Sequence, residues 1–124
     1  MRIAIAGELV FSVAVGRQVE MMTEEGSTIQ IEGRFEVRPA RLSVEPGAPP
    51  SDGERALLEV LYSRIVDCVV EGSVLTVAFS NGVSLVVPHL EGFEAWNINM
   101  PGRSPNLVVM GPAGEMMIFG TAEG

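Results

Sequence analysis

The chain has 124 residues, of which 47% are hydrophobic and 19% charged, so we expect a single domain over residues 1–124 rather than a disordered chain. Its 16 acidic and 8 basic residues give a net charge of −8, which argues against binding a nucleic-acid backbone. All basic residues are arginine, and the lack of lysine excludes a lysine Schiff base and a phosphate-binding P-loop.

The N-terminal segment is apolar only until Glu8. This run is too short for a signal peptide, and no stretch of the chain approaches the roughly 18 uninterrupted apolar residues that a membrane-spanning helix needs. We therefore expect no membrane insertion and a cytoplasmic location.

The clearest pattern is an internal repeat of residues 9–31 and 65–87, with a constant offset of 56 residues. The offset aligns three pairs of residues: Gly16 with Gly72, Val13 with Val69, and Leu9 with Ile65. In each copy one strand, Val10–Val15 or Ile65–Val70, precedes a hairpin with alternating apolar residues. The repeat predicts two copies of one antiparallel three-strand unit.

The length of the hairpin loops follows from which side chains must share a face. A two-residue Asn81-Gly82 turn would place Phe79 and Leu85 on opposite faces of the ribbon. A three-residue loop from Ser80 to Gly82 places them on the same face, with the glycine in the left-handed position of a G1 bulge. The first copy has the same pattern with a loop from Glu24 to Gly26, so we predict three-residue loops in both hairpins.

The segment between the two copies predicts one strand and one helix. Residues Arg34–Arg38 alternate cleanly and predict a half-exposed strand, and the proline-rich residues 46–50 form a loop. Ser51 and Glu54 then have the spacing of a capping box. We predict one short helix from Asp52 to Tyr62 that links the two β units.

The C-terminal third predicts three strands, around Phe93–Met100, Leu107–Met110 and Glu115–Phe119. The last two are apolar on both faces, whereas a strand with one face in water alternates. Their hairpin is therefore either central in the fold or part of a subunit interface. Its methionines suit an adaptable surface, so we predict a homodimer with an interface at Met110, Met116, Met117 and Phe119.

Together these elements predict an α+β, mainly β fold. Two repeated antiparallel three-strand units are joined by one short helix, and the C-terminal hairpin completes either an open sheet or a small barrel. The pattern leaves the strand order open.

Three short passages carry a family resemblance. Residues 75–82 read LTVAFSNG, residues 94–96 read EAW, and residues 111–115 read GPAGE. They resemble a family of small bacterial proteins of unknown function, which has an L-x-F-x-D-G hairpin, an E-A-W segment and a closing G-G-E-L strand. Here the closing strand has Met116 and Met117 and lacks the terminal tryptophan that the family pattern leads us to expect. The resemblance implies no activity.

The residues that could carry chemistry are few. His89 is the only histidine, and a metal or catalytic role would need partners at a spacing that the sequence lacks. Cys68 is the only cysteine, so an intrachain disulfide is excluded, and its apolar strand predicts a buried structural thiol. A nucleophilic Cys68 would need His89 as its base. We predict no enzymatic activity, no cofactor and no metal.

Two groups of residues remain as candidates for binding. Trp96 and its neighbour Glu94 could contact a ligand or partner, and the alternatives are a core tryptophan and a solvated strand edge. Arg34 and Arg38 share one strand face, where they either bind an anion or pair with neighbouring glutamates.

Acidity, an apolar patch and the lack of catalytic groups favour a non-enzymatic interaction module. Its partner would be a basic protein, by analogy with small acidic proteins that neutralise toxins, and opposite charge would speed their encounter. The candidate contact residues are Trp96, Glu94, His89, Arg34 and Arg38. The alternative is a small-molecule-binding domain with its site near Trp96 and Arg34.

Overall fold

The computed structural model describes residues 1–92 and 94–121. In this part of the chain, short strands and one helix follow one another in the order β1 (Val10–Val15), β2 (Val19–Thr23), β3 (Thr28–Ile31), β4 (Phe35–Arg38), β5 (Leu42–Val44), α1 (Asp52–Leu58), β6 (Ile65–Glu71), β7 (Val74–Phe79), β8 (Ser84–Val87), β9 (Trp96–Asn99), β10 (Leu107–Met110) and β11 (Met116–Phe119). No helix of these residues is long and apolar enough to cross a membrane.

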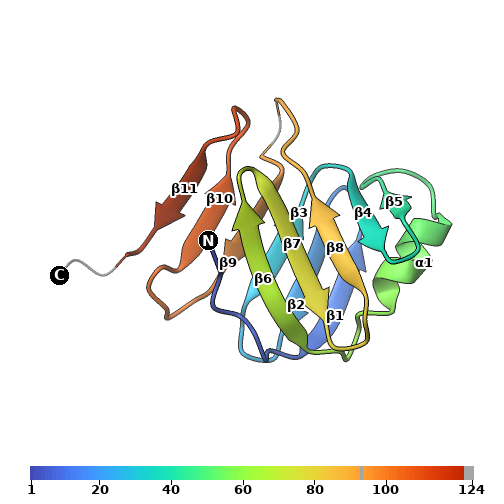
Figure 1. Ribbon diagram of the computed structural model, residues 1–124, viewed down its shortest axis with the longest axis horizontal. Helices are drawn as coiled ribbons and strands as arrows, with labels where there is room; N and C mark the ends of the chain where they lie inside the picture. The colour runs from blue at the N-terminus through green and yellow to red at the C-terminus, as the bar shows by residue number, and fades with distance from the viewer. Residues whose placement is uncertain (93, 122–124) are drawn as a thin grey trace.

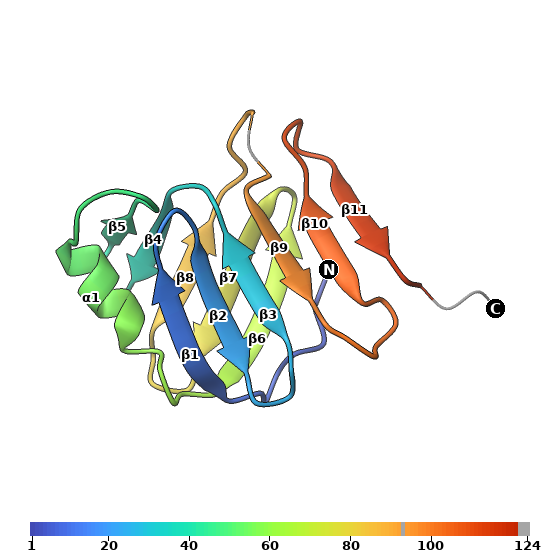
Figure 2. The same cartoon turned by 180° about the vertical axis from the view of Figure 1, so that it is seen from behind.

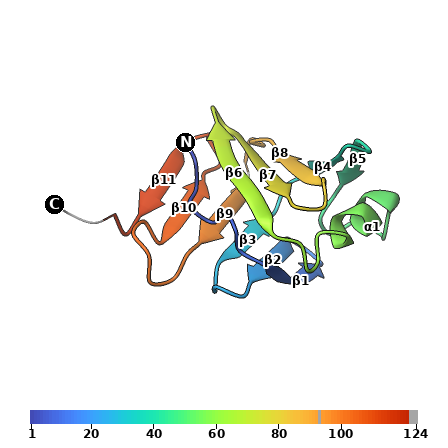
Figure 3. The ribbon, with the colours of Figure 1, turned by 60° about the horizontal axis from the view of Figure 1, so that its bottom comes forward.

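The strands form two antiparallel sheets that pack face to face (Figures 1 and 3). One has six strands in the order β1-β2-β3-β9-β10-β11, and the other has five in the order β5-β4-β8-β7-β6. The mainly β prediction is confirmed. Neither sheet closes on itself, so the architecture is an open sandwich and the small barrel is not formed.

Both hairpins have the predicted three-residue loops. The amide of Thr23 donates to the carbonyl of Ser27, and that of Phe79 donates to Val83, each at 2.9 Å. Gly26 and Gly82 close the loops with φ of +91° and +89°, the left-handed conformation in which glycine carries no steric penalty. This register turns the large apolar side chains of both ribbons toward the space between the sheets.

The strand before each hairpin departs from the predicted alignment. At the predicted offset of 56 residues, Met21 of the first copy corresponds to Val77 of the second. Met21 pairs with Val13, whereas Val77 pairs with Cys68. Val13 therefore corresponds to Cys68, and its predicted alignment with Val69 is wrong by one residue. Seven residues separate the paired Val13 and Met21, whereas eight separate the paired Cys68 and Val77, so the offset in this strand is 55 rather than 56. The common origin of the two units stays a prediction.

Helix α1 begins where the capping box predicts, because the Ser51 side chain accepts a hydrogen bond from the amide of Glu54 at 3.2 Å. It ends at Leu58, earlier than the predicted Tyr62, because the next turns tighten to bonds three residues apart and Tyr62 has a φ of +66°. The helix packs on β5, and a Cβ at Gly53 would overlap the carbonyl oxygen of Ser43.

The remaining strands agree with the prediction only in part. Strand β4 ends at Arg38 as predicted, whereas the three-residue β5 was not predicted. Strand β9 begins at Trp96 rather than Phe93, which lies outside the described residues. The C-terminal hairpin is not central, because β11 lies at the edge of the six-stranded sheet.

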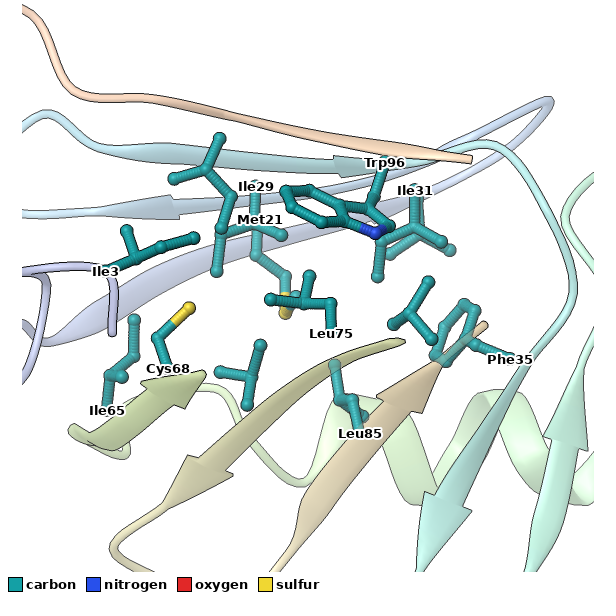
Figure 4. Close-up of a cluster of buried hydrophobic side chains, with 14 of the residues drawn as sticks. Ile3, Met21, Ile29, Ile31, Phe35, Ile65, Cys68, Leu75, Leu85 and Trp96 are labelled. Carbon is teal, nitrogen blue, oxygen red and sulfur yellow. The ribbon is translucent and has the colours of Figure 1, made fainter. Parts of the chain in front are cut away.

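The core fills the space between the two sheets (Figure 4). Trp96, Ile29 and Met21 project from the six-stranded sheet, and Leu75 and Leu85 project from the other. Each of these side chains is fully buried. A domain of this size needs no metal or disulfide when it buries such a core.

Candidate interaction surfaces

Trp96 lies in the core, where its residue has 0% exposure. It pairs with Ile31 on β3 and with Met110 on β10, in the middle of the six-stranded sheet. Its indole Nε1 has no hydrogen-bond partner among the described residues. The structure therefore places this predicted contact residue where a ligand at the protein surface does not reach it.

Arg34 and Arg38 are exposed on β4 and the residues before it. Arg34 lines a shallow hollow of about 220 Å³ with Glu36, Ser43 and Pro88, and Trp96 is not part of its lining. Arg38 Nε donates to Glu36 Oε1 at 2.8 Å, as a surface ion pair. Known ligand pockets enclose roughly 300–1,000 Å³. The structure thus does not bring Arg34 and Trp96 together into one cavity.

His89 is half-buried after strand β8, beside Gly114 in the β10–β11 turn. Its Nδ1 is buried and lacks a hydrogen-bond partner among the described residues. Within the same residues, no group of three His, Cys, Asp or Glu side chains is arranged to hold a metal ion.

A hydrogen-bonded row of side chains crosses the outer face of the six-stranded sheet, the face toward the viewer in Figure 2. Gln30 on β3 donates from Nε2 to Glu20 Oε2 on β2 at 2.8 Å. Asn97 on β9 donates from Nδ2 to Gln30 Oε1 at 3.1 Å and to Glu94 Oε1 at 3.3 Å. We call Glu20, Gln30, Asn97 and Glu94 the acidic row.

The acidic row ends beside an open hollow of about 760 Å³. Glu20 and the exposed Glu32 line this hollow together with Arg17 and Gln18 at the β1–β2 turn. The row and the hollow therefore form one carboxylate-rich area on the outer face.

Only Glu94 of the acidic row was singled out in the sequence. The pairing of Glu20 with Gln30 follows from the predicted hairpin register, since both lie on its polar face, so this half of the row could have been found. Asn97 joins them because β9 pairs with β3, and no local pattern predicts this pairing of distant strands.

The second exposed feature is strand β11, where the four residues Met116, Met117, Ile118 and Phe119 are each 37–48% exposed. Three of the predicted interface residues, Met116, Met117 and Phe119, lie here. Met110 does not, because its side chain is on the inner face and fully buried.

A family model of unknown function, DUF6188, matches residues 1–120. The chain belongs to the DUF6188 family. The match takes in both sheets and the helix, from the N-terminal segment to β11. No curated protein and no solved structure matched the chain. Membership thus supports the expected uncharacterised family and leaves the motifs of the resemblance as predictions.

Near the N-terminus, this DUF6188 domain also holds a partly buried ion pair. Glu8 accepts hydrogen bonds from Arg103 at 2.6 Å and from the Thr23 hydroxyl at 2.7 Å. Arg103 also donates to the carbonyl of Ala4 at 2.9 Å. The cluster ties the N-terminal segment to the end of β2 and to the β9–β10 loop, which indicates a structural role.

Cys68 of the DUF6188 domain is buried, and burial raises the pKa of its thiol to about 12, with smaller contributions from the charges of Asp67 and Glu8. The thiol therefore stays protonated at neutral pH, and a thiolate nucleophile is not formed.

We expect the Cys68 thiol to react with a thiol reagent only as fast as the protein unfolds. The free energy of unfolding should also fall between about pH 9 and pH 12, by up to about 1.4 kcal/mol per pH unit, because the thiol ionises there only in the unfolded chain. Denaturation across this range, with Cys68→Ala as the control that lacks this slope, measures the effect. Equal rates of thiol labelling in the native and the unfolded protein would contradict the burial of Cys68.

Proposed function

We propose that this DUF6188 domain is a non-enzymatic interaction module that binds a basic protein through its acidic row and the adjoining hollow. The observation that carries the proposal is the hydrogen-bonded arrangement of the row. The amides of Gln30 and Asn97 hold Glu20 and Glu94 at its two ends. A surface whose side chains are already fixed loses less conformational entropy when a partner binds.

The geometry of the row suits cationic side chains. Glu20, Gln30 and Asn97 lie on three adjacent strands, which are about 4.8 Å apart, so the row is spread across the sheet rather than along it. Each carboxylate has an oxygen left to accept from an arginine or lysine of the partner. No arginine forms an ion pair with either carboxylate among the described residues.

The charge of the whole chain supports the same partner. Within residues 1–92 and 94–121, ion pairs engage four carboxylates, whereas the chain has 16 acidic residues. The unpaired carboxylates give a negative field that attracts a basic protein and speeds association at low salt.

The test compares binding by the native protein and by the double variant Glu20→Gln/Glu94→Gln. Basic proteins captured at low salt from the source cells are identified, purified and titrated against both forms. We expect the double variant to bind about tenfold more weakly, the effect of two exposed ion pairs. Glu71→Gln, at the exposed end of β6 in the other sheet, is the matched control and should bind normally.

Two outcomes would overturn the proposal: the native chain captures no basic protein at low salt, or the captured protein binds the double variant and the native chain equally. A small metabolite that raises the melting temperature in a thermal-shift screen would instead favour the small-molecule alternative.

A further inference from the structure

The outer edge of strand β11 is open. Its four residues are uncharged and apolar on both faces, and all are exposed. Figures 1 and 2 show β11 extending beyond the five-stranded sheet, so that sheet does not cover it. An exposed apolar strand edge is a template for pairing with another strand, and soluble proteins normally protect such edges.

The other three sheet edges in the described residues are covered along part or all of their length. Residues Met1–Ile3 pair along the edge of β6, with the Ile3 amide donating to the Cys68 carbonyl at 2.8 Å. Helix α1 packs on β5. The edge of β1 contains a bulge and is covered at its two ends, where Tyr62 and Gly47 donate to the carbonyls of Val10 and Gly16, each at 2.7 Å. Only β11 lacks such a cover within the described residues.

We propose that β11 pairs antiparallel with β11 of a second copy, about a two-fold axis at Met117. The amide of Gly111 donates to the carbonyl of Glu115 at 2.8 Å, so alternate residues from Glu115 onward turn their backbone groups toward β10. The amides and carbonyls of Met116 and Ile118 therefore point outward. In the symmetric pair, Met116 lies opposite Ile118 of the second copy. The outward amides and carbonyls of these two residues then form hydrogen bonds between the two copies.

The residues of β11 fit a second copy better than a charged partner strand. Glu115 falls opposite Phe119 of the other copy, so the pairing brings no like charges together. The side chains of Met116 and Ile118 lie on the inner face, because Ile118 pairs with the fully buried Val108 and Met116 with the fully buried Met110. Pairing brings these inner faces of the two copies side by side into one apolar cluster.

In a symmetric pair, the edge of β11 is no longer free to pair with a further strand. The two six-stranded sheets join into one, and the edge that remains at each end is β1, which is bulged and covered at its ends. An isologous contact of this kind closes at two copies and cannot grow into a filament.

The pair should be weak and favoured by salt. A single short strand buries less than the roughly 800 Å² per partner of a standard interface, so we expect a dissociation constant in the micromolar range. Two copies with a charge of −8 each repel one another, and salt screens this repulsion. The dimer should therefore strengthen as ionic strength rises, opposite to the binding of a basic protein.

Light scattering during size-exclusion chromatography over a range of concentrations tests the pairing. Met117→Lys places two like charges at the axis and should leave a monomer at concentrations where the native chain is dimeric. Met22→Lys is the matched control, because Met22 is also 37% exposed on a strand of the same sheet, and it should dimerise normally. Ile118→Pro removes an outward amide without adding charge and should also give a monomer.

A native chain that stays monomeric at several hundred micromolar in high salt, about a hundredfold above the expected dissociation constant, would overturn the proposal. So would a dimer that persists in both Met117→Lys and Ile118→Pro, or an assembly larger than two. A monomer that captures a basic protein, with the capture lost in Met117→Lys, would assign the edge to that protein instead. The Glu20→Gln/Glu94→Gln variant should dimerise like the native chain, which separates this test from that of the acidic row.

Discussion

Replacing Trp96 with alanine should lower the free energy of unfolding by about 3–5 kcal/mol, the usual cost of deleting a buried tryptophan or phenylalanine. The indole is fully buried between the two sheets, beside Ile31 and Met110, and the surrounding strands cannot collapse fully into the space it leaves. Domains are stable by only about 5–15 kcal/mol, so this variant should approach unfolding. Urea denaturation followed by circular dichroism measures the change.

Tyr62→Ala is the aromatic control for this prediction. Tyr62 is 72% exposed, so its removal should change the free energy of unfolding by less than about 1 kcal/mol. Native-like stability of Trp96→Ala would show that the tryptophan does not support the core, and would revive its role as a ligand contact.

Replacing Arg103 with alanine should destabilise the protein by about 3 kcal/mol, because it leaves the Glu8 carboxylate buried without its cation. The Arg103 side chain is 34% exposed and that of Glu8 only 6%, so water screens part of the pair and the cost lies at the lower end of the range for buried pairs. Thermal unfolding should show the loss as a lower melting temperature.

Arg2 provides the matched arginine control. It forms an ion pair with Asp67 at 2.8 Å, but its side chain is 72% exposed. Arg2→Ala should therefore change the melting temperature little. Equal shifts for Arg2→Ala and Arg103→Ala would contradict the structural role of the Glu8 cluster.

The sequence predicted the features that depend on neighbouring residues. The register of both hairpins follows from one requirement, that Phe79 and Leu85 share a buried face, and the start of α1 follows from the spacing of Ser51 and Glu54. The length of α1 was wrong because the tightening after Leu58 depends on how the chain enters β6.

Features that depend on strand order could not be predicted. The hairpin at Leu107–Phe119 was apolar on both faces, and its pattern fitted either a central position or an interface. Its edge position follows from the pairing of β9 with β3, which also buries Met110 and completes the acidic row with Asn97. Glu8 appeared only as the end of an apolar run, because its partner Arg103 is 95 residues away.

Hydrogen exchange of the β11 amides, measured by NMR at increasing protein concentration, tests most directly whether this edge pairs with a second copy. We predict that the outward amides of Met116 and Ile118 exchange fast in dilute protein and become protected as the concentration rises. The amide of Met117, which faces β10, should be protected throughout. Fast exchange at Met116 and Ile118 at every concentration would contradict this pairing.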